Sequence, residues 1–199
     1  MPDLAGAAHY ARERLKRELS PHLTYHSLTH TCDDVVVAAT YLAQRLGLVS
    51  EVLLLVQTAA WYHDIGFVIA RHNHETHSIA IAAEMLPVYG YCAAQINEIA
   101  GMIAATRIPQ MPQTISEQVV ADADLDVLGR ADFAQRNQAL RAETAAYLRP
   151  MGDAEWYAAQ FGFLRAHTYW TAAARKYRDA GKRRNIDLLQ TRLLAAGGA

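Results

Sequence analysis

The dipeptide His63-Asp64 is the pattern in this sequence that points most directly to chemistry. It ends a segment rich in Val, Leu and Ala, and His63 continues the apolar helical stripe of Val56 and Ala60. Both side chains are therefore expected in the core, where polar groups without partners are costly. A divalent cation would satisfy both, because imidazole nitrogen and carboxylate oxygen are ordinary metal ligands. A salt bridge to an arginine is the alternative.

Carboxylates that could complete such a site occur in a later run of three aspartates. Asp124 shares its helical face with Val120 and is therefore expected to project into the core as a ligand. Asp122 and Asp126 lie four residues apart on a different face, and we expect them either to be solvated or to support a ligand from behind. Asp124 is thus the predicted ligand among the three.

The remaining histidines of interest form two groups. His26 and His30 lie four residues apart, so they share one face if that stretch is helical. His74 precedes Glu75 at a predicted junction between a loop and a helix. A carboxylate in a first helical turn also favours the helix dipole, so Glu75 has an ordinary structural explanation beside a catalytic one. A lone histidine on an apolar face is likewise more often a hydrogen-bonded core residue than a ligand.

Hydrophobic periodicity predicts that helices carry all of these residues. Apolar side chains recur every three or four residues, and the alternation typical of strands is missing. The predicted helical segments are Leu4–Leu19, Val35–Leu46, Val52–Ile65, Ile79–Leu86, Ile96–Ala105, Val119–Leu128, Phe133–Leu148 and Ala154–Tyr177. Gly181 is expected to mark a break after the last of them. We therefore predict an all-α fold of about eight or nine helices.

Composition narrows the class of protein. The 199 residues are 52% hydrophobic and 20% charged, which indicates a folded chain rather than a disordered one. Nineteen Lys and Arg against twenty Asp and Glu give a net charge of −1, so no strong attraction to nucleic acid is expected. The apolar stretches fall short of the ~20 residues that cross a bilayer. Two cysteines do not make a disulfide scaffold. The sequence indicates a cytoplasmic protein without a membrane partner.

With these patterns combined, the sequence resembles the HD-domain superfamily of metal-dependent phosphohydrolases. The stretches that carry the resemblance are His30-Thr31-x-x-Asp34-Val35, His63-Asp64-Ile65-Gly66 and Asp122-Ala123-Asp124-Leu125-Asp126-x-Leu128-Gly129. The resemblance covers about residues 22–130, which would form the metal-binding core of an HD-like helical bundle. Length and helical patterning predict a single domain over residues 1–199. Residues 131–199 carry no motif of the superfamily and are expected to form a C-terminal helical extension packed on that core.

The resemblance also implies a set of metal ligands. These are His30, His63, Asp64 and Asp124. Members with two metals place another histidine after the doublet, which corresponds to His74, and His26 and Asp122 are candidates for a second metal or for support of the first. Such members also tend to carry a histidine on the next helix, where this sequence has Thr106. That departure favours one tightly held metal, or a second one held weakly.

The implied reaction is hydrolysis of a phosphoester of a nucleotide or another small phosphorylated metabolite. A divalent ion (Mn, Ni, Mg, Zn or Fe) would activate water for this reaction. His63 and Asp64 are expected to act with Glu75 in catalysis, and Arg107 and His167 to bind the phosphate. The alternatives are a di-iron oxygenase of the same superfamily and a non-catalytic ligand-binding module. A homo-oligomer is also compatible with the sequence.

Overall fold

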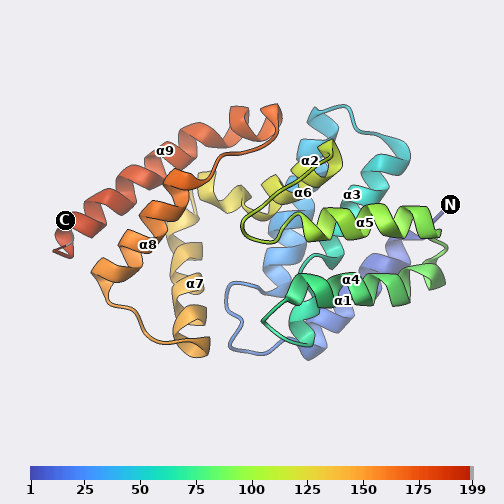
Figure 1. Cartoon of the computed structure of the whole chain (residues 1–199), viewed down its shortest axis with the longest axis horizontal. Coiled ribbons are helices and arrows are strands. Elements are labelled where there is room, and N and C mark those ends of the chain that lie inside the picture. The colour runs from blue at the N-terminus through green and yellow to red at the C-terminus, as the bar shows by residue number, and fades with distance from the viewer. Residues whose placement is uncertain (198–199) are drawn as a thin grey trace. The chain divides into compact units, whose positions relative to one another are not determined.

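The computed structural model describes residues 1–197, in which helices are joined by turns (Figure 1). These residues contain nine α-helices and no strand, so the predicted all-α class is confirmed. The helices are α1 (Leu4–Glu18), α2 (Val36–Arg45), α3 (Ser50–Tyr62), α4 (His74–Met85), α5 (Ala93–Ala104), α6 (Ile115–Asp124), α7 (Phe133–Tyr147), α8 (Asp153–Ala166) and α9 (Ala172–Ala195). Four short helices lie between them: the π-helix η1 (His30–Val35) and the 3-10 helices η2 (Ile65–Val68), η3 (Leu86–Tyr89) and η4 (Asp126–Gly129).

The chain forms two compact units. The N-terminal unit comprises residues 1–20 and 26–125. The C-terminal unit comprises residues 21–25 together with the chain from Asp126 onward. The predicted metal-binding core, residues 22–130, thus corresponds largely but not entirely to the first unit. The prediction of a single domain with a packed extension stays a prediction.

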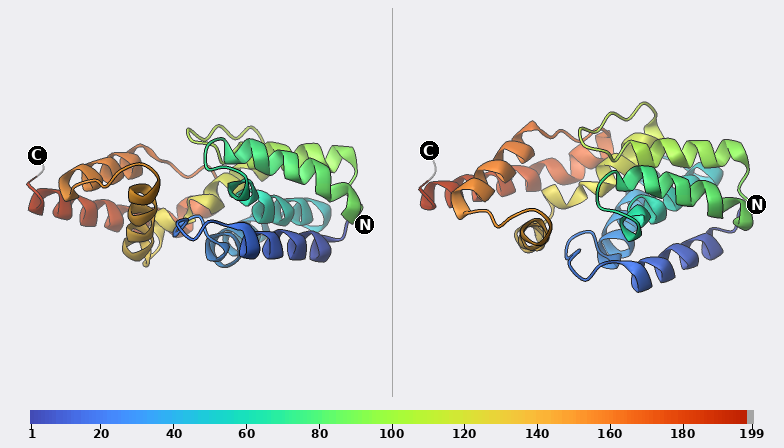
Figure 2. Two further views of the ribbon diagram at one scale, coloured as in Figure 1. Left: turned by 90° about the horizontal axis from the view of Figure 1, so that it is seen from below. Right: turned by 60° about the horizontal axis from the view of Figure 1, so that its bottom comes forward.

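Helix α3 forms the centre of the N-terminal unit, where α1, α2, α5 and α6 pack against it (Figures 1 and 2). Its sequence is apolar on nearly every side, which is typical of a helix that its neighbours cover all round. Leu55, Val56, Ala59 and Ala60 are buried, and a fully buried large apolar side chain contributes about 1.5–3 kcal/mol. Because the doublet follows at the end of this helix, the core fixes the position of His63.

In the C-terminal unit, α8 and α9 pack side by side as separate helices (Figures 1 and 2). The predicted single segment Ala154–Tyr177 is wrong, because residues 167–171 interrupt it. The break predicted at Gly181 is also wrong, since this residue lies inside α9. A Cβ atom there would overlap the carbonyl oxygen of Gly129, so the glycine lets α9 cross η4 closely.

The segment Pro21–Tyr25 joins the C-terminal unit through polar contacts with α7. The backbone N–H of Tyr25 donates a hydrogen bond to Oε2 of Glu143 at 2.9 Å. The Thr24 hydroxyl donates to the carbonyl oxygen of Ala139 at 2.8 Å. The Glu143 side chain is fully buried, so this contact lies in a water-poor environment where a hydrogen bond is strong.

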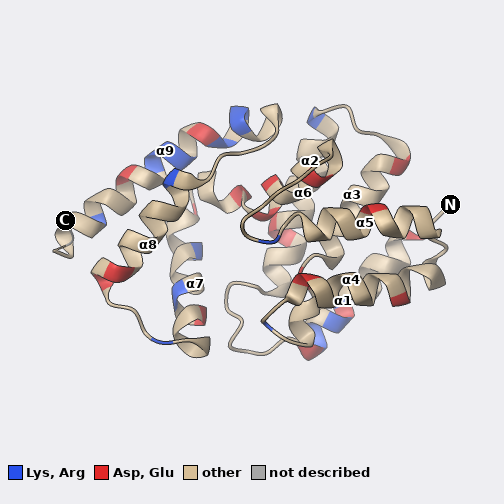
Figure 3. Ribbon diagram, viewed as in Figure 1, with Lys and Arg blue, Asp and Glu red and all other residues tan. Residues whose placement is uncertain are grey.

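Helix α9 is 24 residues long and rich in Lys and Arg (Figure 3). Neither this helix nor any other within residues 1–197 has an apolar stretch long enough to cross a bilayer. The cytoplasmic location predicted from the sequence stays a prediction.

Candidate metal centre

The end of α3 positions the histidine of the doublet. His63 follows the last residue of that helix and is fully buried. Its Nδ1 atom lies 2.8 Å from the carbonyl oxygen of Ala60. Because a carbonyl oxygen only accepts hydrogen bonds, Nδ1 carries the proton and Nε2 points toward the carboxylates. This is the arrangement that a metal-ligating histidine needs.

Ser78 and Gly66 hold the turn after the doublet against α4. The Ser78 hydroxyl donates to the carbonyl oxygen of His63 at 2.7 Å and accepts from the N–H of Gly66 at 2.8 Å. A Cβ atom on Gly66 would overlap the carbonyl oxygen of His74. The glycine therefore allows the first turn of α4 to approach the doublet closely.

The π-helix η1 supplies the second histidine of the centre. His30 begins this helix and is buried. Its Nε2 atom lies 3.3 Å from Oδ1 of Asp124 and 3.7 Å from Oδ2 of Asp64. The sequence predicted a helix from Val35 onward; the chain is already helical at His30, in the wider π form that is frequent at functional sites.

The structure brings the four predicted ligands together. Ligand atoms of His30, His63 and Asp124 all lie within 4.8 Å of one another. Asp64 lies beside this triad, with Oδ2 at 3.2 Å from Nε2 of His63. Three segments far apart in the sequence, namely η1, the turn after α3 and the end of α6, thus converge within the N-terminal unit.

Two atoms of the doublet show that a metal ion fits these residues. Among the residues that the structure describes, His63 Nε2 and Asp64 Oδ2 are buried and make no hydrogen bond. A buried polar atom in this state costs about 1–3 kcal/mol. A cation bound by both atoms would remove that cost, and imidazole with carboxylate is a donor set that Zn, Mn, Fe and Ni accept.

The charges of the cluster are mutually dependent. Burial alone would lower the pKa of His63, but the Asp64 and Asp124 carboxylates outweigh it and raise this pKa well above its ordinary value. Burial alone would raise the pKa of Asp64, but His63 and His74 hold it well below its usual range. The same opposition, with His30 and His63 as partners, leaves the pKa of Asp124 at about 2. A metal ion would take the place of the protons on the histidines.

His74 and His26 lie next to the four ligands. Nε2 of His74 is 3.3 Å from Oδ1 of Asp64, on the opposite carboxylate oxygen from His63. The His74 and His26 rings both stack on Phe67, with centroid distances of 4.0 and 4.6 Å. Their predicted role at a second metal stays a prediction, and their proximity to Asp64 is compatible with it.

The burial of Asp122 and Asp126 contradicts one expectation from the sequence. Both are buried, so the solvated alternative is wrong for both. Asp122 is covered because α2, α3 and α5 all pack against α6. Asp126 lies beyond the end of α6, where helical face geometry no longer applies, and in the C-terminal unit it accepts two hydrogen bonds from Arg178 at 2.6 and 3.0 Å. Neither belongs to the triad of clustered ligand atoms within the described chain.

Glu75 and Arg107 lie at the edge of the cluster. Glu75 is buried, and its Oε2 atom lies 3.7 Å from Nδ1 of His74. Nε of Arg107 is 3.9 Å from the same oxygen, and an Nη2 proton of Arg107 is donated to the Thr76 hydroxyl at 3.0 Å. Half of the Arg107 side chain is exposed, so a charged group can reach it from solvent.

His167 lies in the C-terminal unit, in a cationic environment. Lys182 donates a hydrogen bond to the carbonyl oxygen of His167, and its Nζ atom is 3.4 Å from Nδ1 of the ring. Burial, together with the Lys182 charge, lowers the pKa of His167 to about 4. The ring is therefore neutral near pH 7 and lacks the charge that attracts phosphate. Its predicted phosphate-binding role stays a prediction.

Asp34 is a buried carboxylate that the sequence reasoning did not assign to the site. Its Oδ2 atom lies 3.7 Å from Nδ1 of His30, on the ring edge that faces away from Asp124. The four-residue spacing of His30 and Asp34 was a usable signal, since such residues share one helical face. Ser78, which ties the doublet to α4, has no comparable signal in the sequence.

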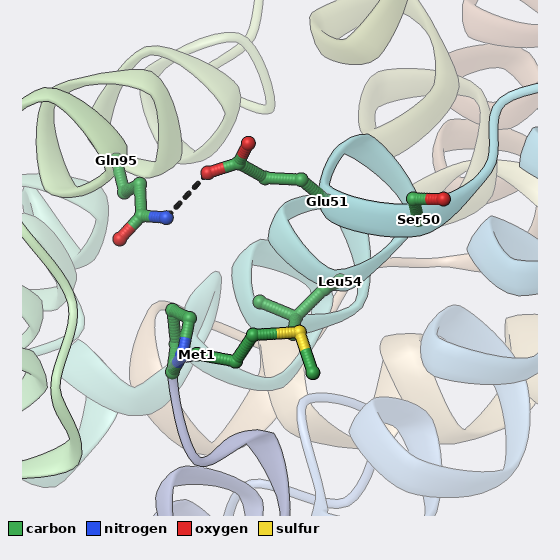
Figure 4. A pocket seen from close by; sticks show the side chains of 6 residues that line it. Met1, Ser50, Glu51, Leu54 and Gln95 are labelled. Carbon is green, nitrogen blue, oxygen red and sulfur yellow. Dashed lines mark hydrogen bonds between the residues drawn. The ribbon is translucent and has the colours of Figure 1, made fainter.

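A cavity of about 420 Å³ lies elsewhere in the N-terminal unit (Figure 4). Met1, Pro2 and Leu54 contribute apolar walls, and the Gln95 amide donates a hydrogen bond to Glu51 at 2.5 Å. None of its lining residues is a predicted site residue, so the cavity is distinct from the metal centre.

Comparison with known proteins relates this chain to the HD domain. Residues 28–126 match the family model of the HD domain. A solved structure described as a predicted HD superfamily hydrolase, from an uncultured Thermotogales bacterium, superposes with a TM-score of 0.64 at 23% identity. The match covers 99% of this chain and 94% of that one. At this identity the likeness concerns the fold alone. A comparison with curated proteins gives no match.

Proposed function

The chain belongs to the HD-domain superfamily, which includes metal-dependent hydrolases, and from this premise we propose that it hydrolyses a phosphoester of a nucleotide or another small phosphorylated metabolite. The observation that carries the proposal is the intact set of clustered donors: His30, His63 and Asp124 within 4.8 Å, with Asp64 beside them. A chain that had lost catalysis would have no need to keep three buried ionisable groups and a fourth, partly buried one, whose clustering is costly without a cation.

His30, His63, Asp64 and Asp124 would hold the divalent ion. When bound, such an ion lowers the pKa of a water molecule and neutralises charge on a phosphoryl oxygen. His63 presents Nε2 to the centre because its Nδ1 proton is donated to the Ala60 carbonyl. The two carboxylate oxygens of Asp64 face different histidines: Oδ2 lies beside His63 and Oδ1 beside His74.

Glu75 and Arg107 supply the remaining functions in this proposal. Glu75 is buried beside His74, where its carboxylate can accept a proton from the attacking water. Arg107 is half exposed and oriented by Thr76, so its guanidinium can bind the substrate phosphate. The contact between Arg107 and Glu75 restrains both groups before substrate arrives.

The test is metal analysis of protein purified without chelator, followed by a screen of nucleotides, cyclic nucleotides and sugar phosphates. We expect one divalent ion per chain and release of phosphate, or of a phosphomonoester from cyclic substrates. Two irons per chain with an electronic absorption band would instead support the di-iron oxygenase, for which the closeness of His74 to Asp64 is the favourable observation. Absence of metal under every loading condition would contradict both.

A further inference from the structure

The two histidine ligands of the centre are backed by different groups. The Nδ1 proton of His63 is donated to a neutral backbone carbonyl, that of Ala60, at 2.8 Å. Nδ1 of His30 instead faces Oδ2 of Asp34 at 3.7 Å. Both histidines turn Nε2 toward the acidic side of the cluster, so the partner at Nδ1 is what distinguishes them.

The setting of the His30 and Asp34 pair makes an electrostatic contact effective. His30 is 1% exposed and Asp34 7% exposed, so little water screens the two groups. Both lie on the π-helix η1, four residues apart, and the packed helix keeps them on one face. The separation of 3.7 Å exceeds a hydrogen bond by less than 1 Å, and a small side-chain rotation closes it.

From these observations we propose that Asp34 is a positioning residue that holds His30 as the Nδ1–H tautomer and strengthens Nε2 as a metal donor. The inference rests on the proposed metal-binding function of the cluster. A carboxylate behind a histidine ligand fixes its ring orientation and raises its basicity more than a neutral carbonyl does. His30 is thus the stronger donor of the two histidines, and His63 the weaker one.

Zinc affinity, measured by competition with a chromogenic chelator, tests the proposal without any substrate. Asp34→Asn keeps the shape of the side chain and removes its charge, and we expect zinc to bind about 10- to 100-fold more weakly. Asp33→Asn is the matched control, because it removes the same charge from the neighbouring exposed residue; its effect should stay within about twofold. Asp34→Glu, which restores the carboxylate, should recover most of the affinity.

A spectroscopic measurement separates positioning from a merely structural role. In zinc-loaded protein with 15N-labelled histidine, we expect His30 to show a proton on Nδ1 that is shifted strongly downfield by the carboxylate. Asp34→Asn should move this proton upfield and leave the corresponding His63 signal in place. If Asp34→Asn does not fold, the wild-type spectrum alone decides, because zinc bonded through Nδ1 of His30 would overturn the proposal.

The other outcomes are distinguishable. Wild-type zinc affinity in Asp34→Asn, or an equal loss in Asp33→Asn, contradicts the role of Asp34 and leaves the proposed hydrolase untouched. Zinc binding that depends on Asp34 in a protein that hydrolyses no phosphoester contradicts the proposed reaction and supports the role of Asp34. A chain that binds no zinc at all contradicts the role of Asp34, whereas the hydrolase is contradicted only if no other divalent ion binds either.

Discussion

The N-terminal and C-terminal units each hold a histidine beside a charged group, fully buried His63 in the first and partly buried His167 in the second, and the charges have opposite signs. His63 faces carboxylates, which raise its pKa well above the ordinary value despite its burial. His167 faces the Lys182 ammonium, and burial with that charge lowers its pKa to about 4. The first environment attracts a further cation, and the second repels one.

The comparison shows that burial alone does not identify a functional histidine. Lys182 has an ordinary structural role, since it donates to the carbonyl oxygen of His167 that ends α8, where a cation favours the helix dipole. Nε2 of each histidine is buried without a hydrogen bond, but only that of His63 faces carboxylates, those of Asp64 and Asp124. An excess of buried acceptors, rather than the number of histidines, marks the metal centre.

The largest effect is expected from removal of the acidic charge at the doublet. Asp64→Asn should lower phosphoesterase turnover by at least about 10³-fold and abolish tight metal binding. The substitution replaces a carboxylate ligand by a neutral amide and removes the negative charge beside His63 and His74. Metal content and kcat measure the loss. Far-ultraviolet circular dichroism should show unchanged helicity, and turnover at the wild-type level would refute the centre.

The two aspartates of α6, Asp122 and Asp124, should affect different properties of the protein when each is replaced. Asp124→Asn should weaken metal binding by about 100-fold, because Asp124 belongs to the clustered triad. Asp122→Asn should mainly lower the thermal stability, because the Asp122 side chain is fully buried outside that triad. Isothermal titration with Mn²⁺ and thermal unfolding separate the two effects. A larger loss of affinity in the Asp122 variant would show that the wrong carboxylate was assigned.

Each unit contains a glycine at a close crossing, which gives a matched pair of variants. Gly66→Ala forces a Cβ atom against the His74 carbonyl oxygen and should cost about 2–4 kcal/mol of stability together with metal affinity. Gly181→Ala forces the same conflict with Gly129 and should cost a similar amount, with metal affinity largely retained. Urea unfolding and metal titration provide the measurements. Equal losses of affinity in both variants would mean that the centre depends on the C-terminal unit.

The smallest expected effect is on the pH dependence of the folding stability. Between pH 4 and about 6.5, the ordinary histidine value, the unfolded chain binds a proton at His167 that the folded chain does not. The contribution of this histidine to stability is therefore present above that range and lost as the pH falls through it. His167→Gln should flatten the pH dependence of the urea midpoint, with His9→Gln as a control on the exposed face of α1. An unchanged slope would show that burial and the Lys182 charge do not depress the His167 pKa.

Sequence reasoning succeeded where a regular helix carried the residues. The apolar stripe through Val56 and Ala60 continues to His63, so its burial follows from periodicity. It failed where regular geometry ends or neighbours intervene. On α6, Asp124 was expected in the core and is partly exposed, whereas Asp122 is buried because three helices cover α6. Such packing cannot be deduced from one helix alone.

Glycine illustrates the same limit. The sequence predicted a helix break at Gly181, whereas the structure shows that α9 continues through it and crosses η4. A side chain is excluded there by the carbonyl oxygen of Gly129, a residue 52 positions away in the sequence. The π form of η1, which carries His30 and Asp34, was likewise specified by no sequence pattern.

The short segment Pro21–Tyr25 has a practical consequence for dividing this protein. It lies between two stretches of the N-terminal unit, yet Tyr25 binds Glu143 and both Leu23 and Tyr25 are buried. A fragment cut after Leu125 would keep this segment but lose α7, leaving two apolar side chains without their cover just before His26. Truncation after Leu125 therefore invites aggregation, and a fragment of residues 1–125 would need these five residues redesigned.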